Sequence, residues 1–137
     1  KHISELAFMG FYEVIKNLDK IFSNISFCKK DILAFNPDKI IYIDYPGFNL
    51  RISDWAKKKG FNNHFYISPQ IWAWKEGRIK KIKRSVDKLF VIFPFEKKYY
   101  SDKHNMKTFY FGHPLIEAIN SHVSNTNFFN ESKIPSD

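Results

Sequence analysis

Residues 38–49 read DKIIYIDYPGFN, and they contain the strand–turn–helix unit on which the fold is built. The apolar, β-branched run over residues 38–44 is typical of a buried strand in a parallel sheet. Pro46 and Gly47 predict a turn, and residues 49–59 then read as a helix that ends at Gly60. This stretch therefore predicts an α/β fold.

The same unit recurs along the chain. Further strands are expected at residues 64–67, 88–93 and 108–111, and further helices at residues 77–85 and 95–103. Upstream, apolar residues at three- and four-residue steps predict an amphipathic helix over residues 8–25. A second, short helix is expected at residues 29–35, before Pro37. The alternation predicts a Rossmann-like parallel sheet with helices on both faces.

The composition fits one folded domain. Of 137 residues, 44% are apolar and 18% aromatic, which supplies a core and argues against disorder. A single cysteine, Cys28, excludes an internal disulfide framework and a cysteine-based metal cluster, and it fits a reducing compartment. No apolar run reaches the ~18–20 residues that a membrane-spanning helix needs. The sequence after Ile119 is rich in Asn, Ser and Thr and reads as a linker or frayed end.

The net charge of +8 raises the question of a polyanionic partner. Residues 75–88 form the densest basic segment, with seven basic and two acidic residues. Such a segment suits phosphate, an anionic lipid surface or a nucleic acid, and it is equally typical of a solvated helix face. Against a nucleic-acid-binding domain, no recognised nucleic-acid motif is present, and the aromatic residues cluster near proline breaks.

Polar residues follow the predicted strands at the edge where ligands bind in open α/β sheets. Asp44 ends the first strand, Ser68 follows the second and His113 follows the fourth. A carboxylate in such a cleft can act as a general base, and it can equally bond to the backbone of its own loop. His113 is similarly open to a packing or capping role. Glu96 is expected in the first turn of a helix, where the helix dipole favours it.

Two tryptophans, Trp72 and Trp74, follow a Ser68-Pro69 break. Proline fixes its own backbone and keeps its predecessor out of the helical region, so the tryptophans are expected in a loop. Large aromatic side chains in such a loop either form the wall of a binding site or fill the core.

Five motifs together resemble one family. They are Ala7-Phe8-Met9-Gly10 with Glu13-Val14, Ile43-Asp44-Tyr45-Pro46-Gly47-Phe48-Asn49, Ser68-Pro69-Gln70-Ile71-Trp72-Ala73-Trp74, Phe93-Pro94-Phe95-Glu96 and Gly112-His113-Pro114. Over residues 5–119, their order and spacing resemble lipid-A-disaccharide synthase, a two-domain glycosyltransferase of the GT-B type. One position departs from the family pattern: Gly47 stands where the family usually has an acid, which argues against an essential acid there.

The resemblance implies a hexosyltransferase of lipid A biosynthesis, part of lipopolysaccharide and lipid metabolism in Gram-negative bacteria. It would transfer 2,3-diacylglucosamine from UDP-2,3-diacylglucosamine to 2,3-diacylglucosamine 1-phosphate and release UDP, with no cofactor and no metal. Residues 1–119 would be part of the N-terminal, acceptor-side domain, and residues 120–137 a linker or frayed tail. The UDP-binding C-terminal domain is absent from this stretch, so the stretch alone is expected to be inactive.

The resemblance also assigns roles to single residues. Asp44 aligns with the proposed catalytic base. The predicted substrate-binding residues are Asn49, Ser68, Trp72, Trp74, Arg78 and His113. Among them, the two tryptophans are expected to form an apolar wall. Arg78 and the lysines near it are expected to meet the 1-phosphate of the acceptor or the phosphates of a membrane surface.

A membrane role is implied for the first helix, because the substrates are acylated and insoluble in water. An apolar helix stripe is otherwise ordinary core packing. The expected membrane contacts are Phe11, Tyr12, Val14, Ile15, Leu18, Ile21 and Phe22. The resemblance thus places the protein in the cytoplasm, bound peripherally to the anionic surface of the inner membrane, with no nucleic acid as partner.

Other functions stay open from the residues alone. One is a related GT-B transferase that uses another UDP-sugar. Another is a basic membrane- or nucleic-acid-binding domain without catalysis. Salt-sensitive binding to oligonucleotides would favour a nucleic-acid-binding domain, whereas binding to vesicles without turnover would favour a membrane-associated one.

Overall fold

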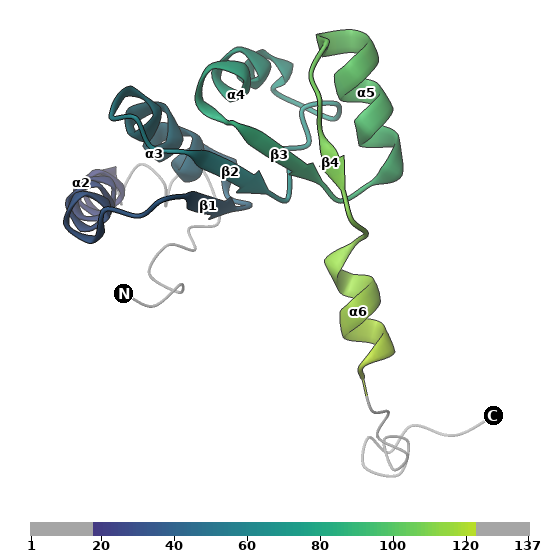
Figure 1. Ribbon diagram of the computed structural model, residues 1–137, viewed down its shortest axis with the longest axis horizontal. Coiled ribbons are helices and arrows are strands. Elements are labelled where there is room, and N and C mark those ends of the chain that lie inside the picture. Colours follow the sequence, from purple (N-terminus) through teal and green to yellow (C-terminus); the bar gives the residue numbers. More distant parts are fainter. Residues whose placement is uncertain (1–17, 123–137) are drawn as a thin grey trace.

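The structure, a computed structural model, describes residues 18–122. Its centre is a four-stranded parallel sheet with the strand order β1-β2-β3-β4 (Figure 1). The strands are β1 (Ile40–Ile43), β2 (Asn63–Tyr66), β3 (Lys88–Val91) and β4 (Phe109–Tyr110). The parallel α/β fold expected from the sequence is therefore confirmed, with strands a little shorter than predicted.

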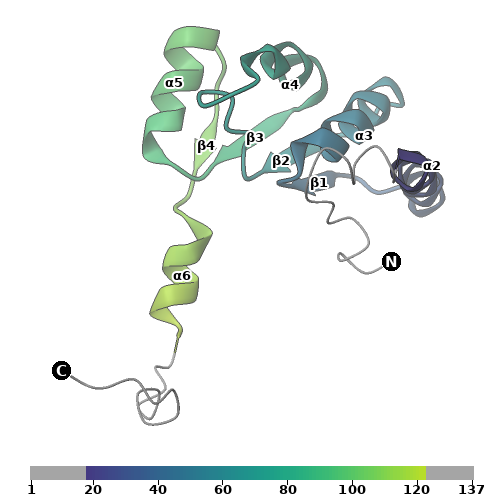
Figure 2. The same cartoon turned by 180° about the vertical axis from the view of Figure 1, so that it is seen from behind.

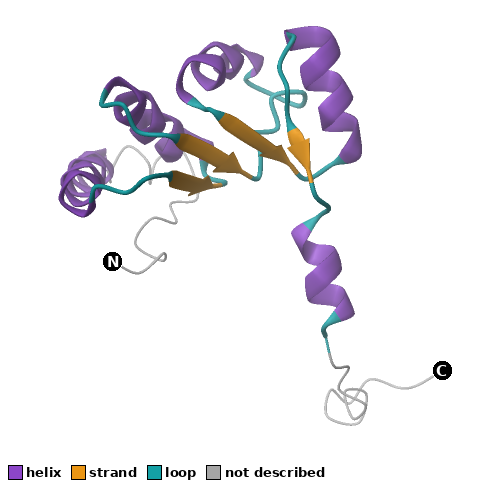
Figure 3. Cartoon of the chain, in the orientation of Figure 1, coloured by secondary structure: helices purple, strands orange, loops and turns teal. Residues whose placement is uncertain are grey.

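Helices precede, connect and follow the strands. They are α2 (Leu18–Phe35), α3 (Pro46–Lys58), α4 (Ile79–Ser85), α5 (Pro94–His104) and α6 (Pro114–Asn120), with a short 3-10 helix, η2 (Glu76–Arg78), before α4. Because the strand order follows the chain and parallel crossovers are right-handed, α3, α4 and α5 lie over the same face of the sheet (Figures 1 and 3). α2 packs against α3, and α6 runs away from the sheet (Figure 2).

The other face of the sheet carries apolar side chains. Along β1, Tyr42 is buried beneath the helices, whereas Ile41 and Ile43 are 65% and 61% exposed on the opposite face. Phe90 and Phe109 continue this face on β3 and β4, with ring centroids 5.5 Å apart. Within residues 18–122, the helices thus cover one of the two faces that the sequence predicts to be covered.

α2 differs from the prediction because it is one continuous helix, not a helix that ends near residue 25 followed by a short one. No glycine or proline interrupts residues 18–35. Ile25 is buried, and Cys28 and Ile32 continue its face at three- and four-residue steps against the core. The packing of this face stabilises residues 25–29 as helix, where the sequence predicted a break between two helices.

α6 was not expected from the sequence, which was read as a linker soon after this point. Pro114 stands in its first turn, where a missing N–H has no cost. His113 caps the helix, since its Nδ1 accepts a hydrogen bond from the backbone N–H of Leu115 at 3.2 Å. These two local signals are sufficient to begin a helix of seven residues.

One buried amide connects the sheet with two helices. Asn63, the first residue of β2, donates from Nδ2 to the carbonyls of Ser53 in α3 and Ser85 in α4, at 2.9 and 2.8 Å. Its Oδ1 accepts from the Tyr42 hydroxyl of β1 at 3.0 Å, and burial raises the pKa of Tyr42. The backbone of Asn63 bonds both ways to Asp87, at 2.8 Å each, just before β3. Asn63 therefore fixes three strands and two helices to one another.

The backbone ladder continues beyond the ends of the strands. The N–H of Asp44 donates to the carbonyl of Tyr66 at 2.9 Å, and the N–H of Ser68 donates to the carbonyl of Phe90 at 3.1 Å. The residues that follow β1 and β2 are therefore held beside each other at the carboxyl edge of the sheet, where open α/β folds bind their ligands.

We expect Asn63→Ala to lower the free energy of unfolding by about 2–4 kcal/mol, because two backbone carbonyls and the buried hydroxyl of Tyr42 each lose a hydrogen-bond partner. Chemical unfolding followed by circular dichroism measures this loss. The control is Asn62→Ala, at the exposed neighbouring position, which should change stability by less than about 0.5 kcal/mol. Equal stabilities for the two variants would contradict the role given to Asn63.

Candidate functional site

Asp44 lies directly after β1 in an unusual backbone conformation. Asp44 and Tyr45 have φ values of 46° and 44°, in the left-handed region. Asn49, from the first turn of α3, donates from Nδ2 to the carbonyls of Ile43 and Asp44, at 3.1 and 2.8 Å. The side chain of Asn49 thus satisfies the carbonyls that the turn leaves free, and it holds the exposed Asp44 at the carboxyl edge.

Strained residues gather around this edge. Besides Asp44 and Tyr45, Ile67 after β2 has φ 61° and Lys75 before η2 has φ 54°. A β-branched residue such as Ile67 adopts positive φ only where its surroundings enforce it. Strained backbone persists only where other contacts of the fold compensate its cost, and it is found most often at functional sites. The observed outliers therefore support a site at the ends of β1 and β2.

The loop after β2 is fastened to α5 by a buried carboxylate. Glu96 is fully buried, and its Oε2 accepts hydrogen bonds from the N–H groups of Ile92 and Phe93 at 3.2 and 3.1 Å. Its Oε1 accepts from Nε1 of Trp72 at 3.1 Å. Trp72 also packs edge-on against Phe95, with ring centroids 5.0 Å apart. Glu96 lies in the first turn of α5, as predicted, and it also determines where Trp72 lies.

Ser68 supports the same loop from inside. It is buried, and its hydroxyl lies 2.9 Å from the hydroxyl of Tyr100. Tyr100 in turn donates to the carbonyl of Pro69 at 3.0 Å, and burial raises the pKa of Tyr100. The described contacts of Ser68 are thus structural, and its predicted contact with substrate stays a prediction.

Trp74 lies on the outside of this loop and faces two cations. It is 57% exposed, and its ring is 4.4 Å from Nζ of Lys75 and 5.1 Å from the guanidinium carbon of Arg78. Cation–π contacts of this kind orient a positive charge without neutralising it. Burial lowers the pKa of Arg78, although an arginine stays charged at neutral pH.

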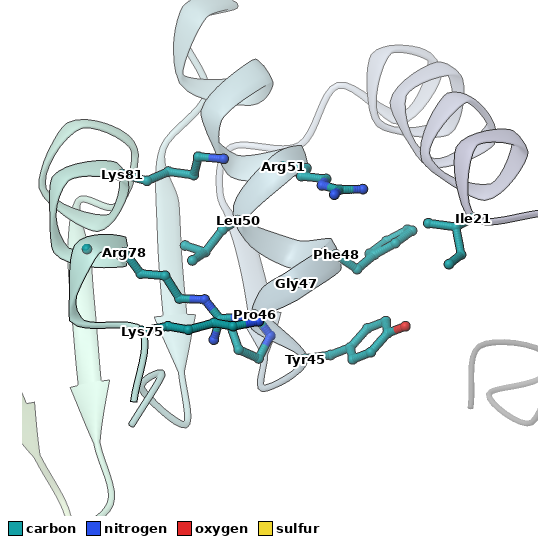
Figure 4. A pocket seen from close by; sticks show the side chains of 11 residues that line it. Ile21, Tyr45, Pro46, Gly47, Phe48, Leu50, Arg51, Lys75, Arg78 and Lys81 are labelled. Carbon is teal, nitrogen blue, oxygen red and sulfur yellow. The ribbon is translucent and has the colours of Figure 1, made fainter. Parts of the chain in front are cut away.

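A cavity of about 650 Å³, here called the α3 pocket, opens beside the turn after Asp44 (Figure 4). It is lined by Ile21, Tyr45, Pro46, Gly47, Phe48, Leu50, Arg51, Lys75, Gly77, Arg78 and Lys81. Its volume is in the range of small-molecule sites. The N-terminus of α3 lies in its wall, with no acidic residue in the first turn of that helix.

The α3 pocket has two chemically different sides. On one side, Lys75 and Arg78 reach toward Pro46, and Lys81 lies above them (Figure 4). We call Lys75, Arg78 and Lys81 the cationic side. On the other side of α3, two aromatic rings point toward α2 (Figure 4). Tyr45, Phe48 and Ile21 are the apolar side, in which the two aromatic rings stack with centroids 5.9 Å apart.

The predicted site residues do not all gather in one place. Arg78 lines the α3 pocket, and Asp44 and Asn49 form the turn beside it. His113 follows β4, three strands away from the end of β1, which places it about 14 Å along the same edge. His113 caps α6 and packs its ring against Phe93 at 5.3 Å. The sequence therefore predicted the edge correctly, but the structure separates His113 from Asp44 along it.

Sequence reasoning missed most of the lining of the α3 pocket. Tyr45 and Phe48 were quoted as parts of a motif and given no role. Lys75 and Lys81 were included without being named, among the lysines near Arg78 that were expected to meet a phosphate. A signal existed for the lysines, since Lys75, Arg78 and Lys81 recur at three-residue steps and so share one side of the η2–α4 segment.

Most of the predicted membrane-contact residues lie outside the part of the chain that the structure describes. Phe11, Tyr12, Val14 and Ile15 lie outside the described residues, and Leu18 is described only as the first residue of α2. Of the remaining two, Ile21 packs against the core and lines the α3 pocket, whereas Phe22 is 55% exposed. No helix over residues 18–122 is long and apolar enough to cross a membrane.

We expect Glu96→Ala to loosen the loop that carries Trp72, because the indole N–H and two backbone N–H groups lose their acceptor. Stability should fall by about 2–4 kcal/mol. Hydrogen exchange should rise over residues 68–75, and acrylamide should quench tryptophan emission more strongly. Lys97→Ala, at the exposed adjacent position, should leave stability, exchange and quenching unchanged. Unaltered exchange in the Glu96 variant would show that the loop is held by other contacts.

Comparison with known proteins assigns the family. The family described as lipid-A-disaccharide synthetase matches residues 1–137. A lipid-A-disaccharide synthase from Trichlorobacter lovleyi is 46% identical over 116 residues, which cover 85% of this chain and 30% of that protein. For the synthase from Coxiella burnetii the identity is 44% over 114 residues, which cover 83% of this chain and 30% of that protein.

A third relative extends the match. The lipid-A-disaccharide synthase from Idiomarina loihiensis is 39% identical over 132 residues, which cover 96% of this chain and 35% of that protein. The chain thus spans about a third of the length of the curated relatives it matches. Because the family match covers every residue, the chain belongs to the lipid-A-disaccharide synthase family.

Proposed function

We propose that this chain is the acceptor-side part of a glycosyltransferase that makes the acylated disaccharide of lipid A. The donor is UDP-2,3-diacylglucosamine, the acceptor is 2,3-diacylglucosamine 1-phosphate, and UDP is released. The observation that carries the proposal is Asp44, fixed in a left-handed turn at the carboxyl edge of a sheet whose sequence matches this family throughout. The donor is expected to bind in a second, GT-B-type domain beyond this stretch.

Asp44 is proposed as the general base. Its carboxylate takes the proton from the acceptor hydroxyl while that oxygen forms a bond to the anomeric carbon of the donor. The bond from this carbon to the diphosphate breaks at the opposite face, and UDP leaves with the electron pair. Asp44 is exposed, and the hydrogen bonds that hold it among residues 18–122 are made by its backbone, so its carboxylate is accessible to a substrate at this edge.

The other residues have positioning roles in this proposal. Asn49 holds the turn of Asp44 through two carbonyls, so its loss would misplace the base rather than remove it. Trp72 and Trp74 form an apolar wall after β2, with Trp72 fixed by Glu96. Ser68 and His113 stay predicted substrate contacts.

We propose a transfer without metal or cofactor, in which a helix dipole and basic groups stabilise the leaving diphosphate.

Peripheral attachment to the anionic inner-membrane surface completes the proposal. The substrates carry acyl chains, so the active site must meet them at a membrane. Phe22, exposed on α2, is the described residue that supports a contact of this helix with lipid. Burial of one such ring contributes about 1.5–3 kcal/mol, and lysines near an anionic surface add about 1 kcal/mol each. The protein is accordingly expected on the cytoplasmic side.

Asp44→Asn is expected to lower kcat by about 100-fold or more, because it removes the base and keeps the size of the side chain. Release of UDP by the complete protein, supplied with both substrates, measures this effect. Asp38→Asn is the matched control, since Asp38 is an exposed acid at the other end of β1. Near-normal turnover in the Asp44 variant would remove Asp44 from the mechanism, and an equal loss in both variants would indicate a general effect of charge.

Phe22→Ser is expected to weaken binding to anionic vesicles roughly tenfold, as the loss of ~1.5 kcal/mol of apolar burial implies. Co-sedimentation of the complete protein with phosphatidylglycerol vesicles measures it. The comparison variant is Phe35→Ser, at the other end of α2, where the ring is 82% exposed and no membrane contact is expected. If both substitutions leave binding unchanged, α2 has no part in membrane attachment.

A further inference from the structure

The charges around the α3 pocket are unevenly paired. Three acids on or beside α3, η2 and α4 are each engaged by a cation outside the pocket. Asp54 of α3 accepts two hydrogen bonds from Arg84, at 2.7 and 3.0 Å. Glu76 of η2 pairs with Lys103 at 2.8 Å.

The third acid is Asp87, before β3. It is held by Lys57 and by the backbone N–H of Asn63. Burial raises the pKa of Asp87, but these two hydrogen bonds outweigh burial and leave its pKa below the ordinary value. All three acids are therefore occupied in contacts that hold the helices, the strands and α5 together.

Among the described residues, no acid forms an ion pair with the cationic side. In the ion pairs formed among residues 18–122, Lys75, Arg78 and Lys81 take no part. Arg51 takes none either, and its guanidinium lies 6.0 Å from the ring of Phe22 on α2. Arg78 is also half-buried, so its guanidinium has lost part of its hydration and gained the face of Trp74 in return. A cluster of unpaired cations beside a helix N-terminus that lacks an acid attracts an anion with several oxygens.

The volume of the α3 pocket and its apolar side further restrict the kind of ligand that fits. About 650 Å³ is more than a bare phosphate ion fills. The apolar side offers two stacked rings, and Arg51, the charged lining residue on that side of α3, is directed toward the ring of Phe22 in α2 (Figure 4). The pocket thus suits one molecule that carries a phosphate at one end and a hydrocarbon chain at the other. Its turn residue Tyr45 directly follows Asp44, so such a molecule would lie next to the proposed base.

We propose that the α3 pocket is the acceptor subsite, in which the phosphomonoester of an acylated sugar lies on the cationic side and an acyl chain lies along the apolar side. This inference rests on the proposed function. It selects Lys75 and Lys81 from the lysines that the sequence placed near Arg78, and it assigns substrate contacts to Tyr45 and Phe48, which the sequence left without a role. The phosphate is bound by fixed charges, so its contribution is to affinity for the acceptor and not to the removal of the proton.

The test compares two ligands and two double variants of the complete protein. The ligands are 2,3-diacylglucosamine 1-phosphate in detergent micelles and the same molecule without its phosphate, titrated calorimetrically. R78Q/K81Q removes two charges from the pocket. K80Q/K83Q removes the same charge from exposed positions of the same helix that do not line the pocket.

For the phosphorylated ligand, R78Q/K81Q should raise Kd at least about tenfold, and K80Q/K83Q less than about threefold. For the ligand without phosphate, both variants should bind like the wild type. In the transferase assay, R78Q/K81Q should raise KM for the acceptor and leave kcat within about threefold, unlike Asp44→Asn. Equal Kd values for the phosphorylated ligand in the two double variants would overturn the subsite.

These readouts separate the subsite from the reaction. If turnover depends on Asp44 but the Kd for the acceptor is unchanged in R78Q/K81Q, the proposed function stands and the subsite is rejected. Phosphate-dependent binding that is lost in R78Q/K81Q, in a protein without transferase activity, would keep the subsite and reject the reaction.

A last arm distinguishes the acceptor phosphate from a membrane headgroup. Phosphatidylcholine vesicles with and without phosphatidic acid should bind R78Q/K81Q and K80Q/K83Q equally, since both variants lose the same charge. A loss of vesicle binding confined to R78Q/K81Q, with acceptor affinity unchanged, would assign the pocket to a lipid headgroup and overturn the proposal.

Discussion

The buried side-chain amide of Asn63 is the constraint on which the arrangement of this domain depends. A parallel strand ordinarily meets its neighbours only through backbone ladders and apolar packing. Here one side chain bonds to β1, to α3 and to α4, while its backbone bonds to the residue before β3. Since a buried amide is costly unless every group is paired, this network admits one position of α3 and α4 over the sheet.

The fixed position of α3 makes the strained turn at Asp44 possible. Two consecutive non-glycine residues in the left-handed region are costly, and they persist only where the surroundings hold both ends. β1 holds one end through its pairing with β2, and α3 holds the other through Asn49. The network around Asn63 and the turn at Asp44 therefore act together through α3. The network orients α3, and the turn presents the carboxylate of Asp44 at the carboxyl edge of the sheet.

The sequence predicted what depends on local pattern and missed what depends on contacts between distant residues. The β-branched run before Asp44 and the strand–helix alternation were sufficient for the parallel sheet, and the proline breaks located its carboxyl edge. Nothing local indicates that Glu96 binds Trp72, that Ser68 faces Tyr100, or that α2 is continuous, because tertiary contacts decide each of these. The strands are apolar on both sides, which is why helices were expected on both faces.

The two sides of the α3 pocket follow from the geometry of a helix. Successive side chains on a helix point about 100° apart, so residues only a turn apart address different neighbours. Phe48 faces α2, whereas the first turn of α3 also lies beside Lys75 and Arg78, which come from the segment between β2 and α4 (Figure 4). A rigid helix thus keeps the cationic and the apolar sides at a fixed separation, and the ring of Trp74 contacts two of the cations, Lys75 and Arg78. In the proposed subsite, an amphiphilic acceptor would then be oriented by its own two ends, with its sugar beside Asp44.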